Sequence, residues 1–186
     1  MDVKNVVLKR STYVYISTFI YVCAFFVFAY IGFRFGNYEI IGNTSAATVN
    51  QNSLFCTISD YTFKGILLNN EIYITKNYLG IFTCGIYPVI LLSFNAGLFG
   101  MIAGKTVVEN GLVFVLIHTL PHCFELVAVV LAAADSMFLG IFLFSKYFHY
   151  HNREINYKTY ILNFVLYTII IAIAAYCEAN VSMKIW

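Results

Sequence analysis

The stretch from Leu116 to Asp135, LIHTLPHCFELVAVVLAAAD, combines ionisable side chains with an otherwise apolar sequence. Two histidines and two carboxylates lie in it, and another carboxylate and an amide lie in other apolar runs. An ionisable residue within a membrane-spanning segment is costly, so it marks a candidate functional site. We therefore predict an intramembrane polar hub. Its members are His118, Pro121, His122, Glu125, Asp135, Glu178 and Asn95.

The spacing of these residues leaves four interpretations open. On a helix that starts at His122, Glu125 lies one turn later on nearly the same face, and Asp135 lies about 80° away from Glu125. The hub could be a structural hydrogen-bonded cluster, a proton or ion relay, a peptide- or substrate-binding groove, or a metal site. The structural interpretation is favoured, because buried polar groups must be paired. Pro121 separates His118 from His122, which works against regular i, i+4 metal ligation, so neither a metal nor another cofactor is predicted.

Motifs for soluble catalysis are missing from the sequence. It contains no GxSxG, HExxH, P-loop or glycine-rich dinucleotide motif. We therefore predict no catalytic residues and no enzyme activity. The net charge of +2 is too small to favour nucleic-acid binding, and the five cysteines contain no CxxC pair.

The composition is that of an integral membrane protein. Of the 186 residues, 61% are hydrophobic and 11% are charged, whereas about a quarter are charged in a soluble domain. The mean hydropathy is +0.78. The lipid bilayer is therefore the first expected partner, and a multi-pass position in the cell membrane is predicted.

Four apolar runs approach the length of about 20 residues that a helix needs to cross a membrane. Segment 106–120 is either a fifth, tilted span or a re-entrant half-helix, and Pro121 marks a break after it. We predict an all-α bundle of about five transmembrane helices, one of them broken at Pro121. The predicted segments are a cytoplasmic N-terminus (1–12), a first span (13–33), an external loop with a short interfacial helix (34–78), and a four-segment bundle (79–103, 106–120, 122–144 and 160–178).

The placement of lysine and arginine favours a cytoplasmic N-terminus. With five crossings, seven of these residues lie inside and four outside. If 106–120 does not cross, the count becomes five inside and six outside. The positive-inside bias therefore favours five crossings.

Small residues recur at helical spacing and predict close helix contacts. One such face lies in the second span, and the matching positions lie in the last two spans. The residues are Ala96, Gly100, Gly104, Ala132, Ala174 and Ala175. A homo-oligomer built on these faces is one expected outcome.

The sequence LPHCFELVAVVLAAADSMFLG resembles the signature of the stage II sporulation protein M family. Pro121, His122 and Glu125 match that pattern, and Cys123 replaces its usual glycine. The stretch FNAGLFG is similar to the family's Asn-Gly…Gly motif, from which Ala96 departs. AIAAYCEANVS resembles its closing stretch with Glu178 in the acidic position, and LLNNE resembles the lead into its second helix.

The resemblance covers roughly 66–182 and implies a five-helix membrane protein without known catalytic activity. It implies a scaffold for peptidoglycan-degrading enzymes during engulfment. Other members are encoded with circular bacteriocins and linked to peptide maturation, export or self-protection. We therefore predict a non-enzymatic scaffold that recruits membrane or envelope proteins. The alternative is a transport, maturation or immunity component for a hydrophobic peptide, with an intramembrane His/Glu relay.

Overall fold

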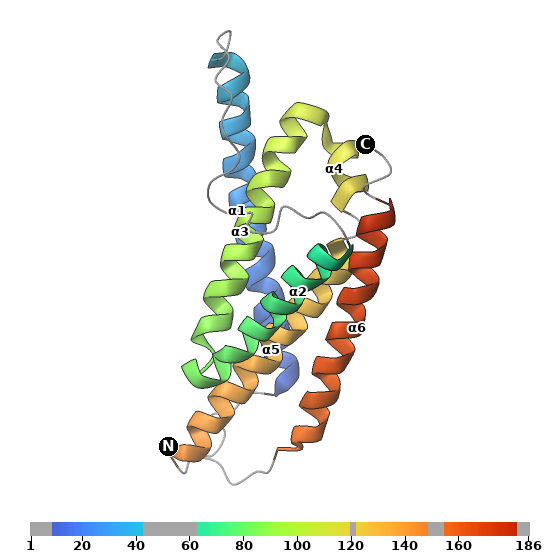
Figure 1. Ribbon diagram of the computed structural model, residues 1–186. Helices are drawn as coiled ribbons and strands as arrows, with labels where there is room; N and C mark the ends of the chain where they lie inside the picture. The colour runs from blue at the N-terminus through green and yellow to red at the C-terminus, as the bar shows by residue number, and fades with distance from the viewer. Residues whose placement is uncertain (1–8, 43–62, 120–121, 149–154, 182–186) are drawn as a thin grey trace.

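The fold is a bundle of helices (Figure 1). The computed structural model describes residues 9–42, 63–119, 122–148 and 155–181. These described residues form helices and contain no strand, which confirms the predicted all-α class. The elements in chain order are α1 (Arg10–Gly42), α2 (Phe63–Tyr78), the 3-10 helix η2 (Leu79–Thr83), α3 (Ile86–Asn110), α4 (Leu112–Thr119), α5 (His122–Tyr147) and α6 (Tyr157–Val181).

Four helices in the described part are long and apolar enough to cross a membrane, namely α1, α3, α5 and α6. They support the multi-pass membrane assignment. Helix α4 has eight residues, which gives about 12 Å at 1.5 Å per residue and is too short to cross. The count of five crossings stays a prediction. The break at Pro121 also stays a prediction, because residues 120–121 lie outside the described residues.

Helices α1 and α3 run parallel and very close together (Figure 1). Gly100 lies against the backbone of Phe25 and Ala29, and Gly104, one turn later, lies against Ala29 and Phe33. A Cβ atom at Gly104 would overlap the carbonyl oxygen of Ala29. The small-residue face predicted in the second span is therefore used inside the chain, where it lets two backbones approach.

Helix α1 extends well past the predicted span of 13–33, from Arg10 to Gly42. The sequence analysis ended the span at Arg34 because of its charge. A charge ends the membrane-buried part of a helix, whereas the backbone hydrogen bonds of the helix can continue through it. The helix therefore extends beyond its apolar segment at the C-terminal end.

Helix α2 packs along the bundle rather than across one of its ends. Because α1 and α3 are parallel, the chain must travel back between them, and α2 with η2 lies on that return path (Figure 1). Ile74 is fully buried in a core cluster with Ala132 and Ile171. The side-chain hydroxyl of Ser136 in α5 donates to the backbone carbonyl of Asn77 at 2.7 Å. The sequence predicted this helix within an external loop, of which residues 43–62 lie outside the described part.

A tight left-handed turn connects η2 to α3. Cys84 and Gly85 have φ angles of 51° and 81°, and the Gly85 N–H donates to the carbonyl of Gly80 at 2.9 Å. The turn lies against Gly140, where an added Cβ would come within 2.8 Å of the Gly80 carbonyl oxygen. Glycine at position 140 therefore lets α5 pass directly over the turn.

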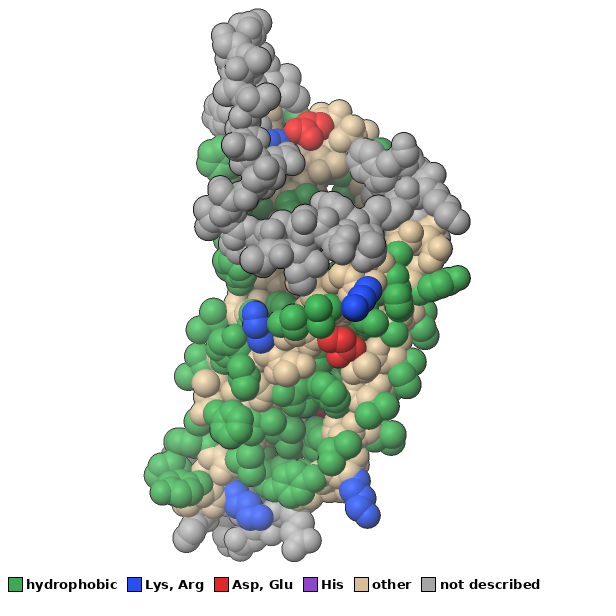
Figure 2. All heavy atoms as spheres, viewed as in Figure 1, with side chains coloured by type: hydrophobic (Ala, Val, Ile, Leu, Met, Phe, Trp, Pro, Cys, Tyr) green, Lys and Arg blue, Asp and Glu red, His purple; other side chains and the backbone are tan. Residues whose placement is uncertain are grey.

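Helix α5 occupies the centre of the bundle, and α1 lies at its edge. Within the most apolar stretch of each helix, 61% of α5 is buried against 11% of α1. Figure 2 shows hydrophobic side chains over much of the described surface on one face, with charged side chains along α2 and basic ones at the lower end. Such an apolar exterior fits a bilayer environment.

Candidate functional site

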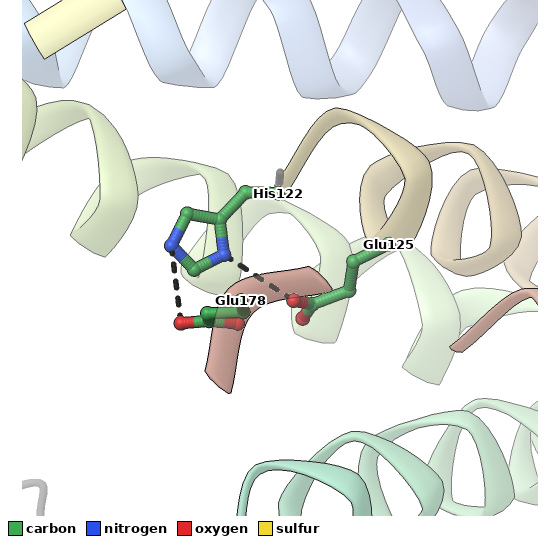
Figure 3. Close-up of side chains that lie close together, drawn as sticks. All are labelled: His122, Glu125 and Glu178. Carbon is green, nitrogen blue, oxygen red and sulfur yellow. Dashed lines mark hydrogen bonds and ion pairs between the residues drawn. The ribbon is translucent and has the colours of Figure 1, made fainter. Parts of the chain in front are cut away.

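The first polar centre lies where the start of α5 meets the end of α6 (Figure 3). We call His122, Glu125 and Glu178 the His–Glu cluster. The Nδ1 atom of His122 lies 3.5 Å from Oε2 of Glu125, and its Nε2 atom lies 3.4 Å from Oε1 of Glu178. The three side chains are 30%, 17% and 19% exposed, in that order of residue number. The imidazole therefore bridges two carboxylates in a half-buried position.

Local sequence explains how this cluster forms. Glu125 follows His122 by three residues in the first turn of α5, so both side chains share one face. Glu178 lies in the last turn of α6, which runs antiparallel to α5. The ring of Phe99 in α3 packs edge-on against the imidazole with 5.5 Å between ring centroids. Three helices therefore fix the position of the histidine.

The charges in the cluster do not cancel within it. If His122 is protonated and both glutamates are ionised, the formal charges are +1 and −2, which sum to −1. An additional proton or a cation would neutralise the remaining charge. The three residues also offer ligand atoms that lie within 4.8 Å of one another, so this is the group in the described residues with the chemistry to hold a metal ion.

Two tyrosines lie next to the cluster. Tyr21 in α1 and Tyr73 in α2 both lie close enough to Glu125 to interact with its charge. The Tyr73 hydroxyl donates to the carbonyl of Leu91 at 2.8 Å, and Asn95 lies beside that hydroxyl. The Tyr21 hydroxyl is buried and has no hydrogen-bond partner among the described residues. Asn95, a predicted hub member, is therefore placed beside Tyr73.

The second polar centre surrounds Asp135 in the middle of α5. We call Arg10, Asp135, Asn163 and Tyr167 the Asp135 network. Arg10 donates from Nε to Oδ1 and from Nη2 to Oδ2 at 3.1 Å. Asn163 and Tyr167, one turn apart on α6, each donate to Oδ2 at 2.8 Å. Asp135 is fully buried, and three side chains satisfy its carboxylate.

Sequence reasoning selected Asp135 but missed Arg10 and Tyr167 as its partners. Arg10 was assigned to the cytoplasmic N-terminal segment because of its position near the N-terminus. Tyr167 was not selected as a candidate site residue, although it lies in the last predicted span. A signal was present, because a carboxylate in an apolar helix requires a partner. The i, i+4 spacing of Asn163 and Tyr167 also puts two donors on one face of a helix.

A fully buried apolar section of α5 separates the two centres. Its residues have no exposed surface. They are Ala128, Val129, Ala132, Ala133 and Ala134. The predicted hub is thus divided, with Asp135 in one centre and the His–Glu cluster in the other.

The remaining predicted residues fall in two groups. Ala132 packs in the core with Tyr167 and Ile171 of α6, and Ala96 packs against Val129 and Ala133 of α5. Ala174 and Ala175 are buried as well. His118 lies in α4, and its side chain is outside the described part of the chain. Pro121 lies outside the described residues altogether.

The comparison with protein families agrees with the resemblance seen in the sequence. The model of the family described as Stage II sporulation protein M matches residues 18–183. This match covers most of the chain, so the chain belongs to that family. No curated protein matches the chain, and no solved structure matches it.

Proposed function

We propose that this member of the stage II sporulation protein M family is a non-enzymatic membrane scaffold that holds other membrane or envelope proteins in place. The observation that carries the proposal is the division of the ionisable residues of α5 into two centres, with an apolar section of the helix between them. A relay for protons or ions needs polar groups that follow one another through the membrane. A scaffold needs only a rigid bundle with a surface for its partner.

The buried section of α5 supports a rigid bundle. Between Glu125 and Asp135, the inward positions are alanine and valine without exposed surface. These side chains carry no group that accepts a proton or binds an ion. Beyond them the Asp135 carboxylate is buried, and each hydrogen bond that it accepts comes from another helix of the chain itself.

The outer face of α1 supports a partner surface. Phe19, Phe26 and Tyr30 are 70%, 65% and 66% exposed. The glycines that contact α1 already hold it against α3. A partner would therefore pack on the aromatic face of α1, where van der Waals contact drives helix association in membranes.

One feature favours the second candidate function, the handling of a hydrophobic peptide. An apolar groove of about 290 Å³ lies between α1 and α5. Val22 and Val127 line it from opposite sides, together with Val14, Thr18, Tyr21, Leu126, Val130 and Leu131. Its size and apolar lining would suit a row of apolar side chains on an extended peptide.

Site-directed photocrosslinking separates the two functions. A photoreactive amino acid is placed at Phe26 on the outer face of α1, at Val22 in the groove, and at the fully buried Leu92 as a control. The scaffold predicts a discrete adduct with a membrane or envelope protein from Phe26 in native membranes, and none from Leu92. An adduct with a small peptide from Val22 alone would support the peptide function instead.

Reconstitution provides a second measurement. Liposomes that contain the purified chain should leak protons no faster than protein-free liposomes, as followed by an entrapped pH-sensitive dye. A proton flux that disappears in Glu125→Gln would contradict the scaffold and support a relay through the His–Glu cluster.

A further inference from the structure

We propose that the His–Glu cluster binds a divalent first-row metal ion, such as Zn²⁺, which clamps the start of α5 to the end of α6. Spacing is the first argument. Around a tetrahedral zinc ion with bonds of 2.0–2.1 Å, two ligand atoms lie about 3.3–3.4 Å apart. The Nε2 atom of His122 and Oε1 of Glu178 lie 3.4 Å apart, which is the spacing of two ligands on one ion.

Glu125 supplies the third ligand. In Figure 3 its carboxylate lies on the same side of the imidazole as that of Glu178, with oxygens of the two groups directed toward each other. One oxygen of each carboxylate and one ring nitrogen lie within 4.8 Å of one another. Rotation of the Glu125 side chain would bring its oxygen onto the ion. The partial exposure of all three side chains leaves a coordination position for water.

The chemistry of the donor set identifies the class of ion. One imidazole nitrogen and two carboxylate oxygens suit zinc, manganese or iron(II), whereas Ca²⁺ and Mg²⁺ prefer oxygen alone. With a neutral imidazole, the two carboxylates carry −2, which a divalent ion cancels. If His122 were protonated and no ion were bound, the cluster would keep a net charge of −1 in a half-buried position, and burying an unpaired charge is unfavourable.

Tyr21 provides an independent observation. Its side chain is 6% exposed, its hydroxyl has no hydrogen-bond partner in the described part of the chain, and it lies within electrostatic range of Glu125. Carboxylates that ligate a metal usually accept a hydrogen bond from a neighbouring group that fixes their orientation. We expect the Glu125 carboxylate, once turned onto the ion, to accept a hydrogen bond from the Tyr21 hydroxyl, which would make Tyr21 a positioning residue.

Metal analysis of the purified chain tests this proposal. The chain is purified in detergent, stripped with a chelator, and titrated with ZnCl₂ while bound zinc and the melting temperature are measured. We expect one equivalent of zinc and a rise in melting temperature that saturates. Both should be lost in Glu178→Gln and in His122→Gln. Tyr21→Phe should keep the stoichiometry but weaken the affinity about tenfold or more.

The controls distinguish this site from other ligands in the chain. Glu109→Gln, in the exposed Lys105–Glu109 pair of α3, should bind zinc as the unaltered chain does, as should the double variant His149→Ala/His151→Ala. Co²⁺ in place of zinc should give visible absorption that changes in Glu178→Asp, a variant that keeps the charge. Zinc binding that survives in both His122→Gln and Glu178→Gln, or that is lost in the His149/His151 variant, would overturn the proposal. These outcomes do not depend on scaffold function.

Discussion

The two polar centres of this bundle differ in how completely they are satisfied. In the Asp135 network, Arg10, Asn163 and Tyr167 direct donors at one fully buried carboxylate over distances typical of strong hydrogen bonds. In the His–Glu cluster, two carboxylates share one imidazole at 3.4 and 3.5 Å, and all three side chains reach solvent. The carboxylate of the first centre has its hydrogen-bond donors in place. The second centre carries excess negative charge and is open enough to bind a cation.

This difference shows that a polar residue in an apolar helix can have two kinds of role. A network of this kind fixes which helices meet, because removing one member deprives the others of a hydrogen-bond partner. An open cluster contributes less to stability but keeps coordination capacity. The same helix, α5, carries both, separated by its buried alanines and valine.

The largest effect is expected from Asp135→Ala. This change leaves the partly exposed Arg10 beside Asn163 and Tyr167 without the carboxylate that accepts their hydrogen bonds. We expect a loss of about 3 kcal/mol in the free energy of unfolding, at the low end for a broken buried pair because Arg10 is 40% exposed. Unfolding by SDS titration in mixed micelles would measure it. An effect below about 1 kcal/mol would mean that the network does not fix which helices meet.

A double variant is the matched control for this prediction. Arg10→Met combined with Asp135→Leu replaces the ion pair by apolar side chains of similar volume, which is often neutral for stability. The double variant should therefore be more stable than Asp135→Ala alone. If the double variant and Asp135→Ala unfold at the same SDS concentration, the loss of stability in Asp135→Ala comes from lost packing rather than from an unpaired charge.

An intermediate effect is expected from Gly104→Leu, which bears on both centres at once. A side chain here would overlap the carbonyl of Ala29 and push α1 away from α3. Helix α1 supplies Arg10 to one centre and Tyr21 to the surroundings of the other. We expect a loss of about 1–3 kcal/mol, the usual cost of overpacking, in the same SDS titration. Ile102→Leu, on the exposed side of α3, should change stability little, and an equal loss there would refute the packing argument.

The smallest effect is expected from Glu125→Gln in the metal-free protein. Its contact with His122 is 3.5 Å long and partly exposed, and such pairs contribute about 0–1 kcal/mol. The stability of the stripped variant should thus stay close to that of the stripped unaltered chain. Cysteine crosslinking between α5 and α6 would check that the helices remain together. A loss as large as that of Asp135→Ala would remove the distinction between the two centres.

Much of the bundle could be predicted from the sequence because membrane burial depends on local composition. The four long apolar runs lie largely within α1, α3, α5 and α6, although the start of the second run, 79–83, forms η2 instead. The position of α2 could not be predicted in this way. Lys64, Glu71 and Lys76 give its sequence the polarity of a loop, while Ile74 and Asn77 are buried in the bundle. The packing position of α2 follows from its contacts with α5 and α6, which are not visible in the sequence.

The candidate site could be predicted residue by residue but not in its arrangement. The i, i+3 spacing of His122 and Glu125 is local, so their pairing follows from helical geometry. The approach of Glu178 to the same imidazole depends on how far α6 slides along α5. Likewise, the pairing of Asp135 with Arg10 depends on where α1 lies, and 125 positions of sequence separate the two residues. Spacing within one helix contains no information on either.

That separation along the chain imposes an order on biosynthesis. Arg10 enters the membrane with the first helix, long before the ribosome has made Asp135, and Tyr167 follows later still. Until then the guanidinium has to remain hydrated or interact with lipid headgroups. We therefore expect the Arg10 guanidinium to gain its hydrogen-bond partners only after α5 and α6 have been synthesised. A chain arrested before α5 would thus lack the carboxylate that pairs with Arg10 in the finished bundle.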